Sequence, residues 1–146
     1  MTIFLLALAV AFTGLQQEQL PRAIDLLEQS GHTYEKSGTG WAIKFKGNNQ
    51  KEVRVFIVQT DEMLVLGSVL AFKNEIGDRP ALMESLLNAS DDYDYVKTTI
   101  DNDGDYATRM DLEREGLTTK RFNDQLMQIA TVTDLLKPIV DKYRKK

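Results

Sequence analysis

The chain has 146 residues and a formal net charge of −4, from 18 Lys and Arg against 22 Asp and Glu. This length suits one domain with a sizeable core, and the acidic balance lacks the electrostatic footprint of a general nucleic-acid binder. There is no cysteine, which excludes disulfides, thiolate metal sites and thiol catalysis. The composition leaves the compartment open, because a cysteine-free domain folds equally well in oxidising and reducing surroundings.

The first 17 residues differ in composition from the rest of the chain. Met1–Gln17 carry no charged side chain, and Ile3–Phe12 are almost wholly apolar. The run is too short for a membrane span, which needs about 20 apolar residues, but it suits a secretory signal cleaved after Ala9-Val10-Ala11. Because no Lys or Arg precedes the run, an N-terminal helix docked on the core remains an alternative. A signal implies a periplasmic or secreted protein; without one we expect a cytoplasmic protein.

Residues 18–146 are predicted to form a single α+β domain. A helix is expected from about Pro21, with Gly31 as its C-terminal cap. Alternating apolar positions then predict strands at residues 32–36, from 41, at 51–59 and at 63–72, in an antiparallel meander. The last of these, Met63–Phe72, is apolar on both faces, which is typical of a central strand or of one side of a partner-binding surface.

The second half of the domain is predicted to be helix, hairpin, helix. Asp78 suits the N-cap of a helix with Pro80 in its first turn. A hairpin from Tyr95 to Glu113 is expected around Asn102-Asp103-Gly104, because these residue types tolerate a positive φ. A long helix then begins near Thr118, where Leu117 and Phe122 are spaced as a hydrophobic staple.

Motifs that carry chemistry are scarce. His32 is the sole histidine, which removes metal sites built on several histidines, and its place after Gly31 favours a surface turn over a catalytic base. Asp101, Asp103 and Asp105 do not fit the register of a calcium loop aligned on Gly104, so hairpin chemistry explains them better. No metal, cofactor or catalytic residue is therefore predicted.

Two clusters of charge have structural explanations. Asp91, Asp92 and Asp94 follow the second helix and are typical of a solvated loop. The basic C-terminus at residues 142–146 suits the end of a helix, where the macrodipole favours cations.

The order of elements resembles a known family. The stretch Trp41-Ala42-Ile43-Lys44-Phe45, the paired strands Val53–Val58 and Leu64–Phe72, and the segment Asp111–Thr118 before a long helix are similar to the YbjN-like family of bacterial sensory transduction regulators. That family is similar in fold to the type III secretion chaperones. The resemblance covers residues 20–143 and implies an α-β-β-β-α-β-β-α sandwich with an antiparallel sheet, often dimeric, with no catalytic residues to carry over.

The sequence therefore favours a non-enzymatic, chaperone- or regulator-like module that holds a peptide or protein on apolar sheet and helix surface. The predicted partner contacts are Trp41, Phe45, Phe56 and Leu66. One alternative is a small enzyme using the carboxylates of Asp91, Asp92 and Asp94. Another is a subunit that self-associates, as a homodimer, through the strand Met63–Phe72. A secretory signal would depart from a cytosolic chaperone role.

Overall fold

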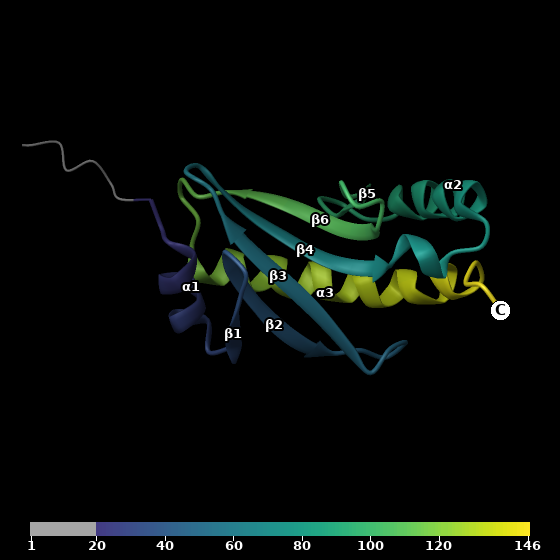
Figure 1. Cartoon of the computed structure of the whole chain (residues 1–146). Helices are drawn as coiled ribbons and strands as arrows, with labels where there is room; N and C mark the ends of the chain where they lie inside the picture. The colour runs from purple at the N-terminus through teal and green to yellow at the C-terminus, as the bar shows by residue number, and fades with distance from the viewer. Residues whose placement is uncertain (1–19) are drawn as a thin grey trace, which may run out of the picture.

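The computed structural model describes residues 20–146, so the predicted signal segment Met1–Gln17 lies outside the described residues. Figure 1 shows an elongated sheet with the long helix α3 along one face and the helices α1 and α2 at opposite ends. The elements are α1 (Ala23–Ser30), β1 (Tyr34–Ser37), β2 (Gly40–Lys46), β3 (Glu52–Gln59), β4 (Met63–Ala71), the short helix η1 (Lys73–Glu75), α2 (Arg79–Ser90), β5 (Lys97–Ile100), β6 (Tyr106–Glu113) and α3 (Thr119–Asp141).

The strands form one six-stranded antiparallel sheet in the order β1-β2-β3-β4-β6-β5. This arrangement confirms the predicted fold class, with β1 as a four-residue strand at one edge. β4 lies between β3 and β6, as its apolar sequence predicts. The other edge is β5, which also has four residues.

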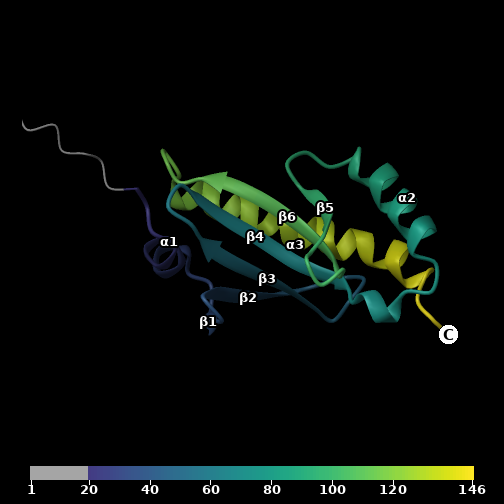
Figure 2. The ribbon, with the colours of Figure 1, turned by 45° about the horizontal axis from the view of Figure 1, so that its top comes forward.

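One face of the sheet holds the core. Successive side chains of a strand point to opposite faces, and the register aligns one apolar set across the sheet, where Ile57 lies opposite Leu66 and Leu66 opposite Met110. α3 crosses this face, as Figure 2 also shows, and contributes Phe122 and Leu126 to the same cluster. Within residues 20–146 no helix is long and apolar enough to cross a membrane.

The other face of the sheet has few exposed apolar side chains. Val58 and Val69 are exposed, and Phe56 is half-buried. The guanidinium of Arg54 lies 4.9 Å from the centre of the Phe56 ring, and Arg54 is ion-paired with Glu35 at 2.7 Å. Phe56 is therefore covered by a charged pair.

Local capping residues set the helix boundaries as predicted. Gly31 ends α1 in the left-handed conformation, with φ of 76°. The carboxylate of Asp78 accepts the N–H of Ala81, and the hydroxyl of Thr118 accepts the N–H of Arg121. Pro138 lies inside α3, which continues past it to Asp141. The last turn is retained with Val140 fully buried in the core.

Candidate functional site: a groove between α2, β5 and α3

Large apolar side chains are exposed mainly at one end of the molecule. Nine are exposed in the described part of the chain, and six of them lie where α2, β5 and α3 meet. The six are Met83, Leu87, Tyr95, Ile100, Met127 and Leu135. Because contiguous exposed apolar surface marks interaction sites, this region is the candidate site.

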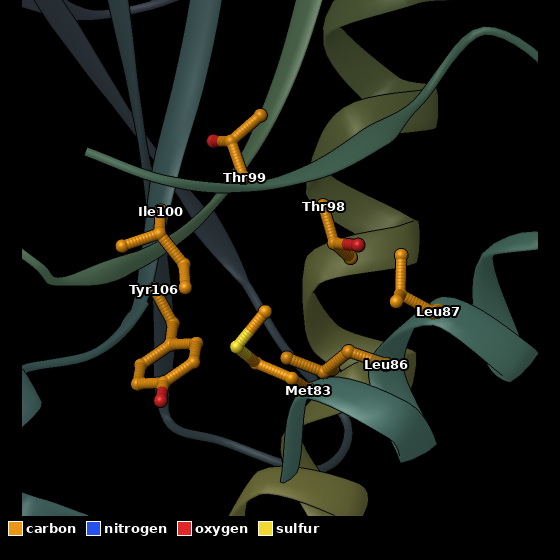
Figure 3. Close-up of a pocket in the computed structure, with 7 residues that line it drawn as sticks. All are labelled: Met83, Leu86, Leu87, Thr98, Thr99, Ile100 and Tyr106. Atoms are coloured by element: carbon orange, nitrogen blue, oxygen red, sulfur yellow. The ribbon is translucent and has the colours of Figure 1, made fainter. Parts of the chain in front are cut away.

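One part of this region is a hollow of about 260 Å³ between α2 and β5. Figure 3 shows Met83 and Leu86 of α2 facing Ile100 of β5, with the Tyr106 ring beside Met83. The Tyr106 hydroxyl accepts a hydrogen bond from Nε of Arg79 at 3.1 Å. The ring is thus fixed as a wall of the hollow.

Two further hollows extend the first one along the surface. The second shares Leu87 and Thr98 with it and adds Tyr93 and Tyr95. The third shares Tyr93 and lies against α3. We call the continuous surface the α2–β5 groove, and its exposed or half-buried lining consists of Met83, Leu87, Ser90, Asp92, Tyr93, Asp94, Tyr95, Lys97, Thr98, Thr99, Ile100, Asp124, Met127, Gln128, Thr131 and Leu135.

The sequence of α2 explains why apolar side chains remain exposed there. Leu82 and Leu86 are buried and face the core. Met83 and Leu87 each follow by one residue, a rotation of about 100° around the helix, and this directs them away from the core. The apolar stripe is therefore wider than core packing needs.

β5 supplies a free sheet edge beside the groove. Within residues 20–146 it pairs only with β6, over Lys97–Ile100. An edge strand presents N–H and C=O groups that a further strand can use. An extended peptide can therefore add to β5 while its side chains enter the apolar hollow, which combines strand addition with groove packing.

Tyr95 is held in an unfavourable conformation at the start of this edge. Its φ is 66°, and it is the only described non-glycine residue with a positive φ. The residue is 74% exposed. A bulky residue in the left-handed region is strained, and such strain at an exposed aromatic is typical of functional surfaces.

The acidic residues Asp91, Asp92 and Asp94 are all exposed, between α2 and β5. Their solvated arrangement gives no support to the alternative of a carboxylate enzyme. Asp101 accepts the backbone N–H groups of Asp103 and Asp105, both at 2.9 Å, within the β5–β6 turn. These contacts are the turn chemistry that the sequence indicates.

The structure does not bring the four predicted contact residues together. Leu66 is 0% exposed and belongs to the core, so its prediction as a surface contact is wrong. Trp41 and Phe45 are half-buried and pack against the same core. Phe56 lies on the opposite face under Arg54. None of the four lines the α2–β5 groove.

Self-association through the edges of β4 is also not supported. β4 is paired with β3 on one side and β6 on the other. A partner can therefore contact β4 only through side chains on the open face of the sheet, where Val69 is exposed.

A different cleft lies where β3 and β4 diverge. Their register covers only Phe56–Gln59 and Leu64–Gly67, and the cleft beyond it is lined by Arg54, Val69, Lys137 and Arg144, among others. The cations there are already paired, since Arg144 bonds Glu75 and Asp141, and Lys137 bonds Asp141. Phe56, one of the four predicted contacts, also lines this cleft. The charged groups of the cleft are paired within the described residues, so it is a weaker candidate than the groove.

The fold and the groove define a small α+β protein with an apolar surface beside a free sheet edge. The family model YbjN, described as "Putative bacterial sensory transduction regulator", matches residues 25–141, and the chain belongs to this family. The predicted family resemblance is confirmed.

Solved structures that share the fold include the following two. The crystal structure of YbjN from E. coli, "a putative transcription regulator", aligns with a TM-score of 0.58 at 15% identity, over 86% of this chain and 97% of that chain. A chain of the crystal structure of the ExsC–ExsE complex aligns with a TM-score of 0.53 at 12% identity, over 80% and 88% of the two chains. No curated protein matches the sequence.

Proposed function

We propose that this protein is a non-enzymatic, regulator- or chaperone-like module that holds an extended segment of a protein partner in the α2–β5 groove. The observation that carries the proposal is the gathering of six exposed large apolar side chains in the groove, four of them in the two hollows beside the free edge of β5. The family description as a regulator supports it. So does the similarity in fold to a chain of a protein–protein complex, ExsC–ExsE.

The mode of binding follows from the geometry of the groove. β5 has four residues, which span about 13 Å at 3.3 Å per residue. A partner strand of similar length forms backbone hydrogen bonds along β5. Its alternate side chains then point into the hollow between Met83, Leu87 and Ile100, where burial of apolar area supplies affinity.

The test is a selection of peptides from a random display library on the full-length protein. Selected peptides are then measured against Met83→Gln/Leu87→Gln, which removes apolar contact area at exposed helix positions without adding charge. Val58→Thr/Val69→Thr is the matched control, because both valines are exposed on the open face of the sheet.

We expect the groove variant to bind selected peptides at least about 10-fold more weakly, equivalent to about 1.4 kcal/mol. The control variant should bind within about twofold of the original protein. If the groove variant binds the peptides as tightly as the original protein and the control variant loses peptide binding, the site lies on the open face and the proposal is wrong. Circular dichroism checks that both variants stay folded.

A further inference from the structure

We propose that the cleft between β3 and β4 binds an extended, uncharged segment of another protein, which pairs its main chain with the strand edges on the two sides of the cleft. This inference goes beyond the proposed function, because it assigns a second binding site in a different part of the sheet. It starts from an interruption in the pairing of the sheet.

β3 and β4 are neighbours in the sheet, but only part of each strand is paired with the other. Their register covers Phe56–Gln59 and Leu64–Gly67, although β3 begins at Glu52 and β4 ends at Ala71. The unpaired stretches flank the cleft, where the two strands diverge in Figure 1. Both stretches remain strands, because β2 pairs with β3 and β6 pairs with β4. The sheet therefore contains two inner edges.

Contacts at both strands keep the cleft open. β4 has a bulge within its unpaired stretch, and a bulge bends the strand that carries it. Just after β4, the carboxylate of Glu75 accepts the backbone N–H of Phe72 at 3.0 Å. The turn before β3 is held to α3, because Asp134 accepts the backbone N–H of Asn48 at 2.8 Å. The cleft is therefore a built feature of the sheet.

The two inner edges offer backbone groups to a strand from outside. Successive residues of a strand direct their N–H and C=O groups to opposite neighbours, so about half of residues 52–55 and 68–71 direct theirs into the cleft. Such an edge is a template for a further strand, and insertion of a strand between two others is an established mode of peptide recognition. Four residues of extended chain span about 13 Å, which sets the length of the paired segment.

The floor of the cleft carries a polar group without a partner. Ser68 is 3% exposed and lines the cleft. Within residues 20–146 its hydroxyl makes no hydrogen bond, whereas its cross-strand neighbour Thr108 bonds Thr133 at 2.6 Å. In the same part of the chain, the one fully enclosed side-chain polar atom without a partner is Oδ1 of Asn123, so the Ser68 hydroxyl is open to the cleft. A polar group of a bound segment satisfies this hydroxyl.

The charges of the cleft indicate an uncharged occupant. Each charged side chain that lines it has a partner within the described residues: Arg54 with Glu35 at 2.7 Å, Glu52 with Lys44 at 3.9 Å, Arg144 with Glu75 at 2.8 Å, and Lys137 with Asp141. A charged side chain of the segment would compete with one of these pairs, and this disfavours charged segments.

The walls of the cleft are largely apolar. Val53 and Leu70 are buried in them, and Val69 and Phe72 are exposed at the rim. The cleft has a volume of about 350 Å³. Valine, isoleucine and threonine side chains match these walls, and the same residues favour the extended conformation that pairing needs.

Another protein is the source of the segment. Met1–Gln17 of this chain carry no charge either, but they suit a secretory signal, which is removed from a mature protein. The test therefore includes this segment as a competing occupant.

The experiment separates the cleft from the α2–β5 groove. Peptides of about seven residues, long enough to span the unpaired stretches, are selected from a random display library on full-length Met83→Gln/Leu87→Gln, in which the groove is weakened. We call them the cleft peptides. Amide hydrogen exchange of the original full-length protein then locates where they bind.

Variants of Ser68 test the floor of the cleft. Ser68→Ala removes the hydroxyl, and Ser68→Val also adds apolar bulk. Ser37→Ala and Ser37→Val are the matched controls, because Ser37 lies in β1 and outside the cleft. Urea midpoints check that all four variants stay folded.

We expect cleft peptides with uncharged side chains at their central positions, and slower exchange at residues 52–55 and 68–71 when they bind. Ser68→Ala should weaken binding about 3- to 10-fold, as suits one buried hydrogen bond. Ser68→Val should weaken it more than about 10-fold, because the added methyl groups fill the floor of the cleft. The Ser37 variants should stay within about twofold of the original protein.

Two results would remove the cleft as a site. One is a selection that yields no binder, or yields peptides that leave exchange at residues 52–55 and 68–71 unchanged. If such peptides protect Lys97–Ile100 instead, the proposed function stands and this inference does not. The other is unchanged affinity in Ser68→Val with the variant still folded.

Two further results would overturn the stated occupant. Asp, Glu, Lys or Arg at the central positions of the cleft peptides would contradict an uncharged segment. Leu6→Asp/Val10→Asp tests the competing segment in the full-length chain. If exchange at residues 52–55 and 68–71 without peptide is faster in this variant than in the original protein, Met1–Gln17 are the occupant and the inference of another protein is wrong.

Discussion

The carboxylate of Asp134 accepts the backbone N–H of Asn49 on both of its oxygens, at 3.1 Å each, although the two residues are 85 positions apart in the chain. The same carboxylate accepts the backbone N–H groups of Asn48 at 2.8 Å and of Gln50 at 3.1 Å. Asp134 belongs to α3, and the three donors form the turn between β2 and β3. One buried side chain therefore fixes this turn to the long helix.

Asp134→Asn should lower the free energy of unfolding by about 2 kcal/mol, because it weakens several charge-assisted hydrogen bonds and turns one acceptor into a donor. Urea denaturation measures the change. Asp124→Asn, on the exposed side of the same helix, should stay within about 0.5 kcal/mol of the original protein. Equal effects of the two substitutions would show that Asp134 does not anchor the turn.

The same contacts predict how stability depends on pH. Burial alone raises the pKa of Asp134, but the N–H donors of Asn48, Asn49 and Gln50 outweigh burial and hold its pKa below the ordinary value for aspartate. Since the pKa is lower in the folded state, the stabilisation is present above the unfolded value and is lost as the pH falls below about 4. Urea midpoints between pH 7 and pH 2 should fall less steeply in Asp134→Asn. The same decrease of the urea midpoint with pH in Asp134→Asn and in the original protein would contradict this.

Arg114 should be sensitive even to replacement by lysine. It is buried, and its guanidinium donates to the carbonyl oxygens of Pro21 at 2.9 Å, Thr60 at 3.1 Å and Leu20 at 3.2 Å. Lysine lacks the planar fork that reaches separate acceptors, so Arg114→Lys should cost about 1.5–3 kcal/mol in denaturant unfolding. Arg109→Lys, at an exposed residue, is the control, and a comparable loss there would contradict the argument.

Tyr95 should show a trade-off between stability and binding. Its positive φ is unfavourable for a bulky side chain but is tolerated by asparagine. Tyr95→Asn should therefore raise the free energy of unfolding by about 0.5–1 kcal/mol, and it should weaken binding of the selected peptides because an exposed ring of the groove is lost. Thermal melts and peptide titrations measure the two effects. If Tyr95→Asn is less stable than the original protein, the ring of Tyr95 stabilises the fold and the prediction is wrong.

The sequence predicts the fold better than the site for a physical reason. Caps and turns are local, so Asp78, Thr118 and Gly104 could be placed from their neighbours alone. The alternation of residues along a strand identifies two sets of side chains, but it does not show which set a helix distant in sequence covers. For this reason the sequence analysis assigns the buried Leu66 and the half-buried Phe56 to one surface.

The α2–β5 groove depends on contacts that no local pattern reveals. It forms because α2 packs beside β5, with the hydroxyls of Ser90 and Thr98 hydrogen-bonded at 2.9 Å. One feature of the sequence does indicate the groove. The apolar residues of α2 come in two adjacent pairs, Leu82-Met83 and Leu86-Leu87, whereas a helix with a single buried stripe needs only one apolar residue of each pair.

The most direct test of the groove is amide hydrogen exchange with and without a selected peptide. The account predicts slower exchange at backbone N–H groups of β5, at Lys97–Ile100, together with protection around Met83 and Leu87 in α2. It predicts unchanged exchange in β2 and β3. Protection confined to β2 and β3, with β5 exchanging as fast as in the free protein, would contradict binding at the α2–β5 groove.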